Sequence, residues 1–99
     1  NIAKSYGIAE TDVIDVFNKS NARSYISESR FPNNILNGKF NGKSSIKNLK
    51  KDLKMMNSIL KNSKSKKKYT ELSNEILSKI DDKFNMEDFT NIYKIWEKI

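Results

Sequence analysis

The residues with the clearest capacity for chemistry in this sequence are lysines. Several fall on one arc of a predicted helix, and the rest lie in the lysine-rich segment that follows it. At about 100° of rotation per residue, the helical lysines lie beside an apolar stripe and do not overlap it. Phosphate backbones attract many cations and need no exact geometry, so this surface is suited to a nucleic acid. The candidate nucleic-acid-binding residues are Lys47, Lys50, Lys51, Lys54, Lys61, Lys64, Lys66, Lys67 and Lys68.

The excess of lysine has two explanations, and the sequence leaves both open. The net charge of +7 indicates a polyanionic partner, with DNA and RNA equally suitable. However, Lys, Asn and Ile supply 42 of the 99 residues, and Lys outnumbers Arg by 17 to 2. All three have AT-rich codons, and surfaces that read phosphates or bases usually enrich Arg. The charge is therefore either a binding footprint or a coding bias.

Other chemistry finds little support in the composition. The chain has no His and no Cys, which removes the commonest general base, thiolate ligands and disulfides. Two acidic pairs, Asp81-Asp82 and Glu87-Asp88, suggest Mg²⁺, but adjacent helical residues point about 100° apart, so capping explains them better. No phosphate-binding glycine loop is apparent. We therefore predict a protein that is not an enzyme, with no catalytic residues, no metal and no cofactor.

The elements that carry the lysines are helices. An apolar residue recurs every three or four positions from Ile46 to Leu60, and Ser44 or Ser45 is a suitable N-cap. Similar spacing predicts helices over residues 69–84 and 86–99. Shorter helices are predicted over 1–8, 9–19 and 21–30. The only proline, Pro32, and two Asn-Gly pairs predict a loop over 32–43.

The predicted fold is therefore all-α, with three longer C-terminal helices and a compact N-terminal unit of short helices. We predict a single domain over residues 1–99, with sub-units of about 1–31 and 44–99 joined by the loop. No apolar run is long enough to span a membrane, and the first ten residues lack the cationic end and apolar block of a signal peptide. An intracellular protein is expected.

The N-terminal stretch NIAKSYGIAETDVIDVF, within residues 1–20, resembles the helix-turn-helix family. That family has Ala in its first helix, Gly four residues later and a β-branched residue six further on, which here are Ala3, Gly7 and Val13. The resemblance implies a DNA-reading second helix. That helix carries Glu10, Asp12 and Asp15, whose charges repel phosphates, so the lysines carry the nucleic-acid prediction instead.

Residues 1–31 also resemble the three-helix ubiquitin-associated family. The residues that carry this resemblance are YGI, then VIDVF, then the polar SNARSYI segment. It implies a small protein-binding surface. Three functions thus remain. The first is a non-catalytic basic domain that binds nucleic acid through phosphate contacts, and the second is a helical interaction module that binds a protein partner or the rest of a larger chain. The third is a purely structural segment of a larger protein.

Overall fold

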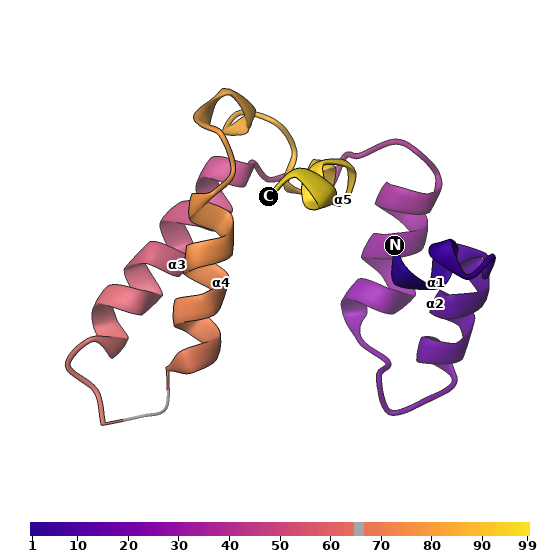
Figure 1. Cartoon of the computed structure of the whole chain (residues 1–99), viewed down its shortest axis with the longest axis horizontal. Coiled ribbons are helices and arrows are strands. Elements are labelled where there is room, and N and C mark those ends of the chain that lie inside the picture. Colours follow the sequence, from indigo (N-terminus) through magenta and orange to yellow (C-terminus); the bar gives the residue numbers. More distant parts are fainter. Residues whose placement is uncertain (65–66) are drawn as a thin grey trace. The chain divides into compact units, whose positions relative to one another are not determined.

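The computed structural model describes residues 1–64 and 67–99, and these residues are arranged as helices and turns (Figure 1). No β-strand forms in these ranges; an isolated antiparallel bridge joins Ser45 and Asp88. The prediction of an all-α fold is confirmed. The chain divides into two compact units, residues 1–42 and 43–99. The prediction that they form one domain stays a prediction.

Unit 1 contains three helices. Helix α1 (Ile2–Ser5) is a single turn, and α2 (Glu10–Asn18) follows it after a corner at Gly7. Gly7 has a φ of +74°, a conformation that costs other residues energy and that glycine adopts readily. Acidic side chains in the first turn of α2 complement the positive end of its dipole. The third element is a π-helix, η1 (Ile26–Leu36).

The path of η1 differs from the predicted one. The sequence predicts a helix that ends near Arg30 because Pro32 follows, whereas η1 continues through Pro32 to Leu36. A proline ring normally clashes with the carbonyl four residues back. A π-helix bonds each N–H to the carbonyl five residues back, and its wider turn relieves that clash. The connection to unit 2 therefore begins later than the predicted loop.

Unit 1 has a small core. Among the described residues of unit 1, Ile14 of α2 is the one hydrophobic residue that is buried, whereas Val16 and Phe17 are 62% and 43% exposed. The contact between α2 and η1 also includes polar groups. Ser27 is buried, its backbone carbonyl accepts a hydrogen bond from the Asn18 side-chain amide, and its hydroxyl donates to the carbonyl of Ser24. With so little buried apolar surface, unit 1 gains little stability from its own packing.

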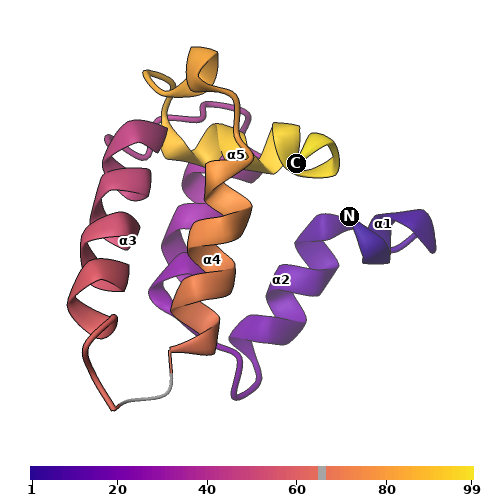
Figure 2. The same cartoon turned by 60° about the vertical axis from the view of Figure 1, so that its left-hand side comes forward.

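Unit 2 is built on an antiparallel helical hairpin. Helices α3 (Ile46–Leu60) and α4 (Lys68–Ser78) run side by side in both views (Figures 1 and 2). Ser45 caps α3 by accepting the backbone N–H of Asn48. The 3–4 spacing of α3 directs its apolar residues toward a core of Ile46, Leu77 and Ile80.

Short turns close the base of this hairpin. They are the 3₁₀ turns η2 (Asp82–Phe84), η3 (Phe89–Asn91) and η4 (Trp96–Lys98) and the short helix α5 (Ile92–Ile95). The sequence predicts one helix over 86–99, but the Asp88 side chain accepts the backbone N–H of Thr90 and starts η3 there. Local capping thus divides the C-terminal segment into turns.

The segment before η3 also pairs with the beginning of α3. The backbone N–H groups of Ile46 and Lys47 donate to the carbonyls of Glu87 and Asn85, both at 2.9 Å. The Asp88 carboxylate accepts the backbone N–H of Lys43 at 2.8 Å. These bonds satisfy donors at the N-terminus of α3 that have no partner within the helix. They hold α3 and its lysines in a defined position on unit 2.

Candidate functional site

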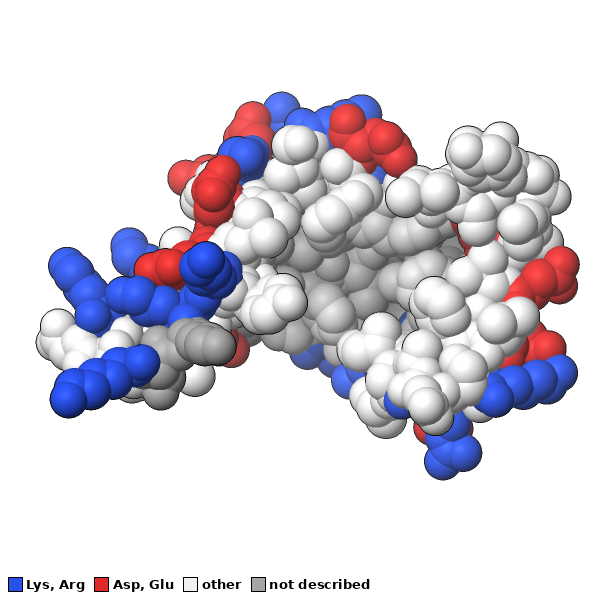
Figure 3. Space-filling view, turned by 60° about the horizontal axis from the view of Figure 1, so that its bottom comes forward, with Lys and Arg blue, Asp and Glu red and all other residues white. Residues whose placement is uncertain are grey.

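The structure distributes the predicted lysines over the hairpin. Four lie on α3, which are Lys47, Lys50, Lys51 and Lys54. Lys61 is the C-cap of α3, Lys64 follows it, and Lys67 and Lys68 begin α4. Lys66 lies outside the described residues. Figure 3 shows lysine side chains, in blue, gathered on the hairpin near the connection between α3 and α4.

Lys50 differs from its neighbours because its ammonium group already binds groups within the protein. Its side chain is only 19% exposed. Its Nζ donates to the backbone carbonyl of Ile80 at 2.6 Å and to Asp82 Oδ1 at 3.2 Å. The carbonyl lies just beyond the end of α4, where cations are favourable. Lys50 therefore joins α3 to the end of α4 and is not available to an external anion.

The other α3 lysines are exposed. Lys47, Lys51 and Lys54 lie on one arc of the helix, which we call the α3 lysine arc. Lys51 forms an ion pair with Asp52 at 3.2 Å, but both side chains are more than 60% exposed. A pair of this kind is screened by water and is easily exchanged for another anion. The arc is therefore accessible to a charged ligand.

A hollow of about 310 Å³ lies beside this arc, between α3 and α4. Its lining combines two ammonium groups, an amide, a hydroxyl and a carboxylate around one leucine. The lining residues are Lys50, Lys54, Asn74, Leu77, Ser78 and Asp82. Hydrogen bonds from Lys50 and from Asn85 hold the pKa of Asp82 below its ordinary value of 3.8, so this carboxylate stays ionised. The hollow is thus polar and carries both signs of charge.

The positive charge of the chain belongs mainly to unit 2. Unit 1 has five Lys and Arg against four Asp and Glu, whereas unit 2 has fourteen against eight. A local excess of this size attracts anions to unit 2 from a distance. Within the described ranges no three His, Cys, Asp or Glu residues are grouped to hold a metal ion. The chemistry that the described residues of unit 2 offer is the attraction of a phosphate or carboxylate.

Comparison with known families gives one match. A family model described as the NAD-binding domain of NADP-dependent 3-hydroxyisobutyrate dehydrogenase matches residues 1–96. The match covers nearly the whole chain, and the chain belongs to this family of dinucleotide-dependent oxidoreductase domains. No curated protein and no solved structure matches the chain.

The match shows that both N-terminal resemblances are wrong. The chain is neither a helix-turn-helix nor a ubiquitin-associated domain, since one family pattern covers both of its units. The helix–glycine–helix corner that suggested them does exist, between α1 and α2. Such a corner needs only a small residue, a glycine and a few apolar positions, so it occurs in unrelated families.

The prediction of a nucleic-acid partner is also wrong, because the family binds NAD. Exposed ammonium groups attract the phosphates of a dinucleotide and those of a nucleic acid by the same physics, so the lysines alone did not separate the two. The alternative of a protein-interaction module is equally contradicted as the function of the chain.

The prediction that the protein is not an enzyme is wrong for a different reason. It rested on the lack of a nucleophile and a general base. In a dehydrogenase the cofactor carries the redox chemistry, and the protein binds and orients it. The sequence predicts no cofactor because it contains no phosphate-binding glycine loop. Separately, none of the helices in the described ranges is long and apolar enough to cross a bilayer.

Proposed function

We propose that this chain forms the helical part of an NADP-dependent dehydrogenase that acts on a small hydroxy acid of the 3-hydroxyisobutyrate type. In this proposal the α3 lysine arc meets the phosphates of the dinucleotide. The exposure of Lys47, Lys51 and Lys54 on one arc of α3 carries the proposal, together with membership of the family. An intracellular location belongs to the same proposal, since the enzyme must work where the cofactor is held.

The residues of the arc suit the phosphates of the cofactor. A lysine ammonium acts as a point charge with three donors, and it binds phosphate without requiring a fixed approach. NADP carries a pyrophosphate and a further phosphate on its ribose. Three ammonium groups on adjacent helical turns match a ligand with several anionic groups. The polar hollow beside Lys54 adds the Asn74 amide and the Ser78 hydroxyl as neutral partners.

The chain supplies only part of a dinucleotide site. The usual pyrophosphate cradle is a glycine-rich turn between a strand and a helix. The described residues form no strand, and Gly7 and Gly38 lie at helix ends with φ near +70°. The cofactor, when bound, supplies the hydride acceptor. The residues of this chain bind and orient its charged groups, while Lys50 holds α3 against the end of α4.

Binding of NADPH to the chain tests the proposal directly. Trp96 is the only tryptophan, lies in unit 2 and is half exposed, so energy transfer from Trp96 to the bound nicotinamide reports binding. We expect binding that weakens as salt is added, because exposed charges are screened. NADPH should bind more tightly than NADH because it has one more phosphate.

Substitution of the arc shows whether these lysines are responsible. The triple variant K47Q/K51Q/K54Q should weaken NADPH binding roughly tenfold, as expected for three exposed contacts of about 0.5 kcal/mol each. Lys79→Gln is the matched control, because Lys79 is an exposed lysine of unit 2 outside the arc. Equal affinity of the triple variant and the wild type would refute the role of the arc.

A further inference from the structure

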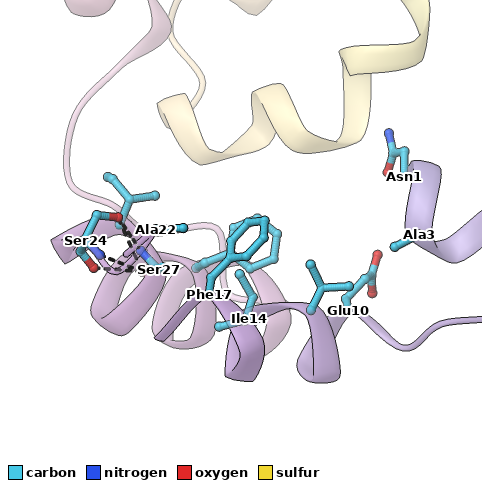
Figure 4. A pocket seen from close by; sticks show the side chains of 11 residues that line it. Asn1, Ala3, Glu10, Ile14, Phe17, Ala22, Ser24 and Ser27 are labelled. Carbon is cyan, nitrogen blue, oxygen red and sulfur yellow. Dashed lines mark hydrogen bonds between the residues drawn. The ribbon is translucent and has the colours of Figure 1, made fainter. Parts of the chain in front are cut away.

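Two Asn-Gly pairs, Asn37-Gly38 and Asn41-Gly42, follow η1 closely in the sequence. An asparagine that precedes glycine can lose its side-chain amide, because the glycine nitrogen reaches the side-chain carbonyl carbon and no Cβ hinders the approach. Neither pair has a part in the proposed function. Both belong to unit 1, which otherwise presents a mostly apolar hollow of about 320 Å³ between α2 and η1 (Figure 4). The two pairs have the same sequence but different surroundings.

The reacting groups of Asn37-Gly38 are all held by hydrogen bonds. Asn37 is the C-cap of η1, and its side-chain amide donates to the backbone carbonyl of Asn33. Its Oδ1 accepts the backbone N–H of Lys39 at 3.0 Å. The N–H of Gly38 donates to the carbonyl of Ile35 at 2.9 Å. An attack of the Gly38 nitrogen on the side chain would first have to break these bonds, so this pair is protected.

Asn41-Gly42 is held differently. Asn41 is exposed, and its Oδ1 accepts a hydrogen bond from the side-chain amide of Asn34 at 2.8 Å. The backbone of Asn34 also accepts the N–H of Phe40 at 2.7 Å, which fixes the two segments beside each other. Gly42 is buried, and its N–H donates to no acceptor among the described residues. The nitrogen is therefore free to attack a carbonyl that a donor holds in place.

The backbone on either side of this pair is strained. Phe40 and Lys43 have φ angles of +46° and +65°, which residues with a side chain rarely adopt. Opening of a cyclic imide to isoaspartate adds one atom to the main chain. The added atom allows the segment to leave the strained conformation, so strain favours the modified product.

We propose that Asn41 deamidates in the folded protein, that Asn37 is protected, and that Asn34 promotes the reaction. The Gly42 nitrogen loses its proton to hydroxide and attacks Asn41 Cγ. The new N–Cγ bond closes a cyclic imide, the Cγ–Nδ2 bond breaks, and Nδ2 takes a proton from water and leaves as ammonia. Negative charge develops on Oδ1 during the attack, where the Asn34 amide donates to it. Water then opens the ring to aspartate or isoaspartate, and the net charge falls by one.

Tryptic mapping of the whole chain tests the choice between the two pairs, since trypsin cleaves after Arg30, Lys39 and Lys43. During incubation at physiological temperature and mildly alkaline pH, the acid and isoaspartate forms should accumulate several-fold faster in peptide 40–43 than at Asn37 in peptide 31–39. Chromatography with mass spectrometry measures both, against a sample digested at the start. In urea the two rates should become equal, because the hydrogen bonds are lost. Equal rates in the folded chain overturn the proposal, as does a difference that persists in urea.

Substitution of Asn34 tests the role of its amide. Asn34→Ala removes the donor and should slow deamidation of Asn41 roughly fivefold, equivalent to about 1 kcal/mol. Asn34→Asp keeps the shape, replaces the donor by an acceptor, and should slow the reaction at least as much. Asn33→Ala is the matched control, because Asn33 is exposed and its backbone carbonyl still accepts the Asn37 amide. Deamidation of Asn41 in N34A and N34D at the wild-type rate or faster, with unchanged far-UV circular dichroism, would refute the role of Asn34.

Discussion

Replacement of Lys50 by methionine should destabilise unit 2, although Lys50 looks like one more surface lysine in the sequence. Methionine keeps most of the aliphatic stem and removes the ammonium group. The bond that matters most joins Nζ to the carbonyl of Ile80 at 2.6 Å, because the Lys50 side chain is only 19% exposed. A hydrogen bond from a charged donor contributes about 1.5–3 kcal/mol. We expect Lys50→Met to lower the free energy of unfolding by about 2 kcal/mol and the melting temperature by roughly 8–16 °C.

The assay uses Trp96 fluorescence during urea and thermal unfolding, because this tryptophan belongs to unit 2. Lys54→Met is the matched control: it removes an exposed lysine one turn away and should change stability by less than about 0.5 kcal/mol. Asp82→Asn separates the two partners of Lys50. The Asp82 side chain is 88% exposed, so its ion pair is screened and the variant should stay close to wild type. Equal losses in K50M and K54M would refute the assignment of Lys50 to the hairpin.

Three further predictions follow from local contacts. Asp88→Ala removes the acceptor of the Thr90 N–H and hydroxyl, at 3.0 and 2.6 Å, and should cost unit 2 about 1–2 kcal/mol in urea unfolding. Hydrogen bonds from Lys83 to Asp81 and from Lys50 to Asp82 lower the pKa of both carboxyls below 3.8, so the stability they contribute is present above that pH and is lost as pH falls through the folded values. The urea concentration at the unfolding midpoint should therefore decrease as the pH is lowered below about 4, and it should decrease less in D81N/D82N. The Cβ that Gly7→Ala adds would meet no atom within 4 Å, so the substitution should lower stability through backbone strain alone, by about 1 kcal/mol. Loss of the helical circular dichroism signal on heating measures this change.

The lysines illustrate how one surface signal divides once the structure is known. Lys50 joins α3 to the end of α4, whereas the lysines of the α3 lysine arc are exposed. The sequence placed all of them in a single candidate binding surface and left coding bias open as the other explanation of the excess. Their separate roles depend on which helix turn each occupies and on what lies opposite.

The sequence by itself determined the features that depend on near neighbours. The 3–4 spacing from Ile46 to Leu60, the serine cap before it and the glycine corner at residue 7 all appear in the structure. These features are local, because helical periodicity, capping and positive φ involve residues within about four positions. The all-α class follows from them.

Tertiary structure decided what depends on distant residues. Lys50 donates to a carbonyl thirty positions away, and the carbonyls of Asn85 and Glu87 accept the first N–H groups of α3, so neither contact leaves a local pattern. The π-helix passes through Pro32 because its wider turn accommodates the ring, which a rule based on α-helices excludes. The class of the protein also needed more than the charge of its lysines, because a dinucleotide and a nucleic acid attract the same ammonium groups. The match of the family over both units distinguished them.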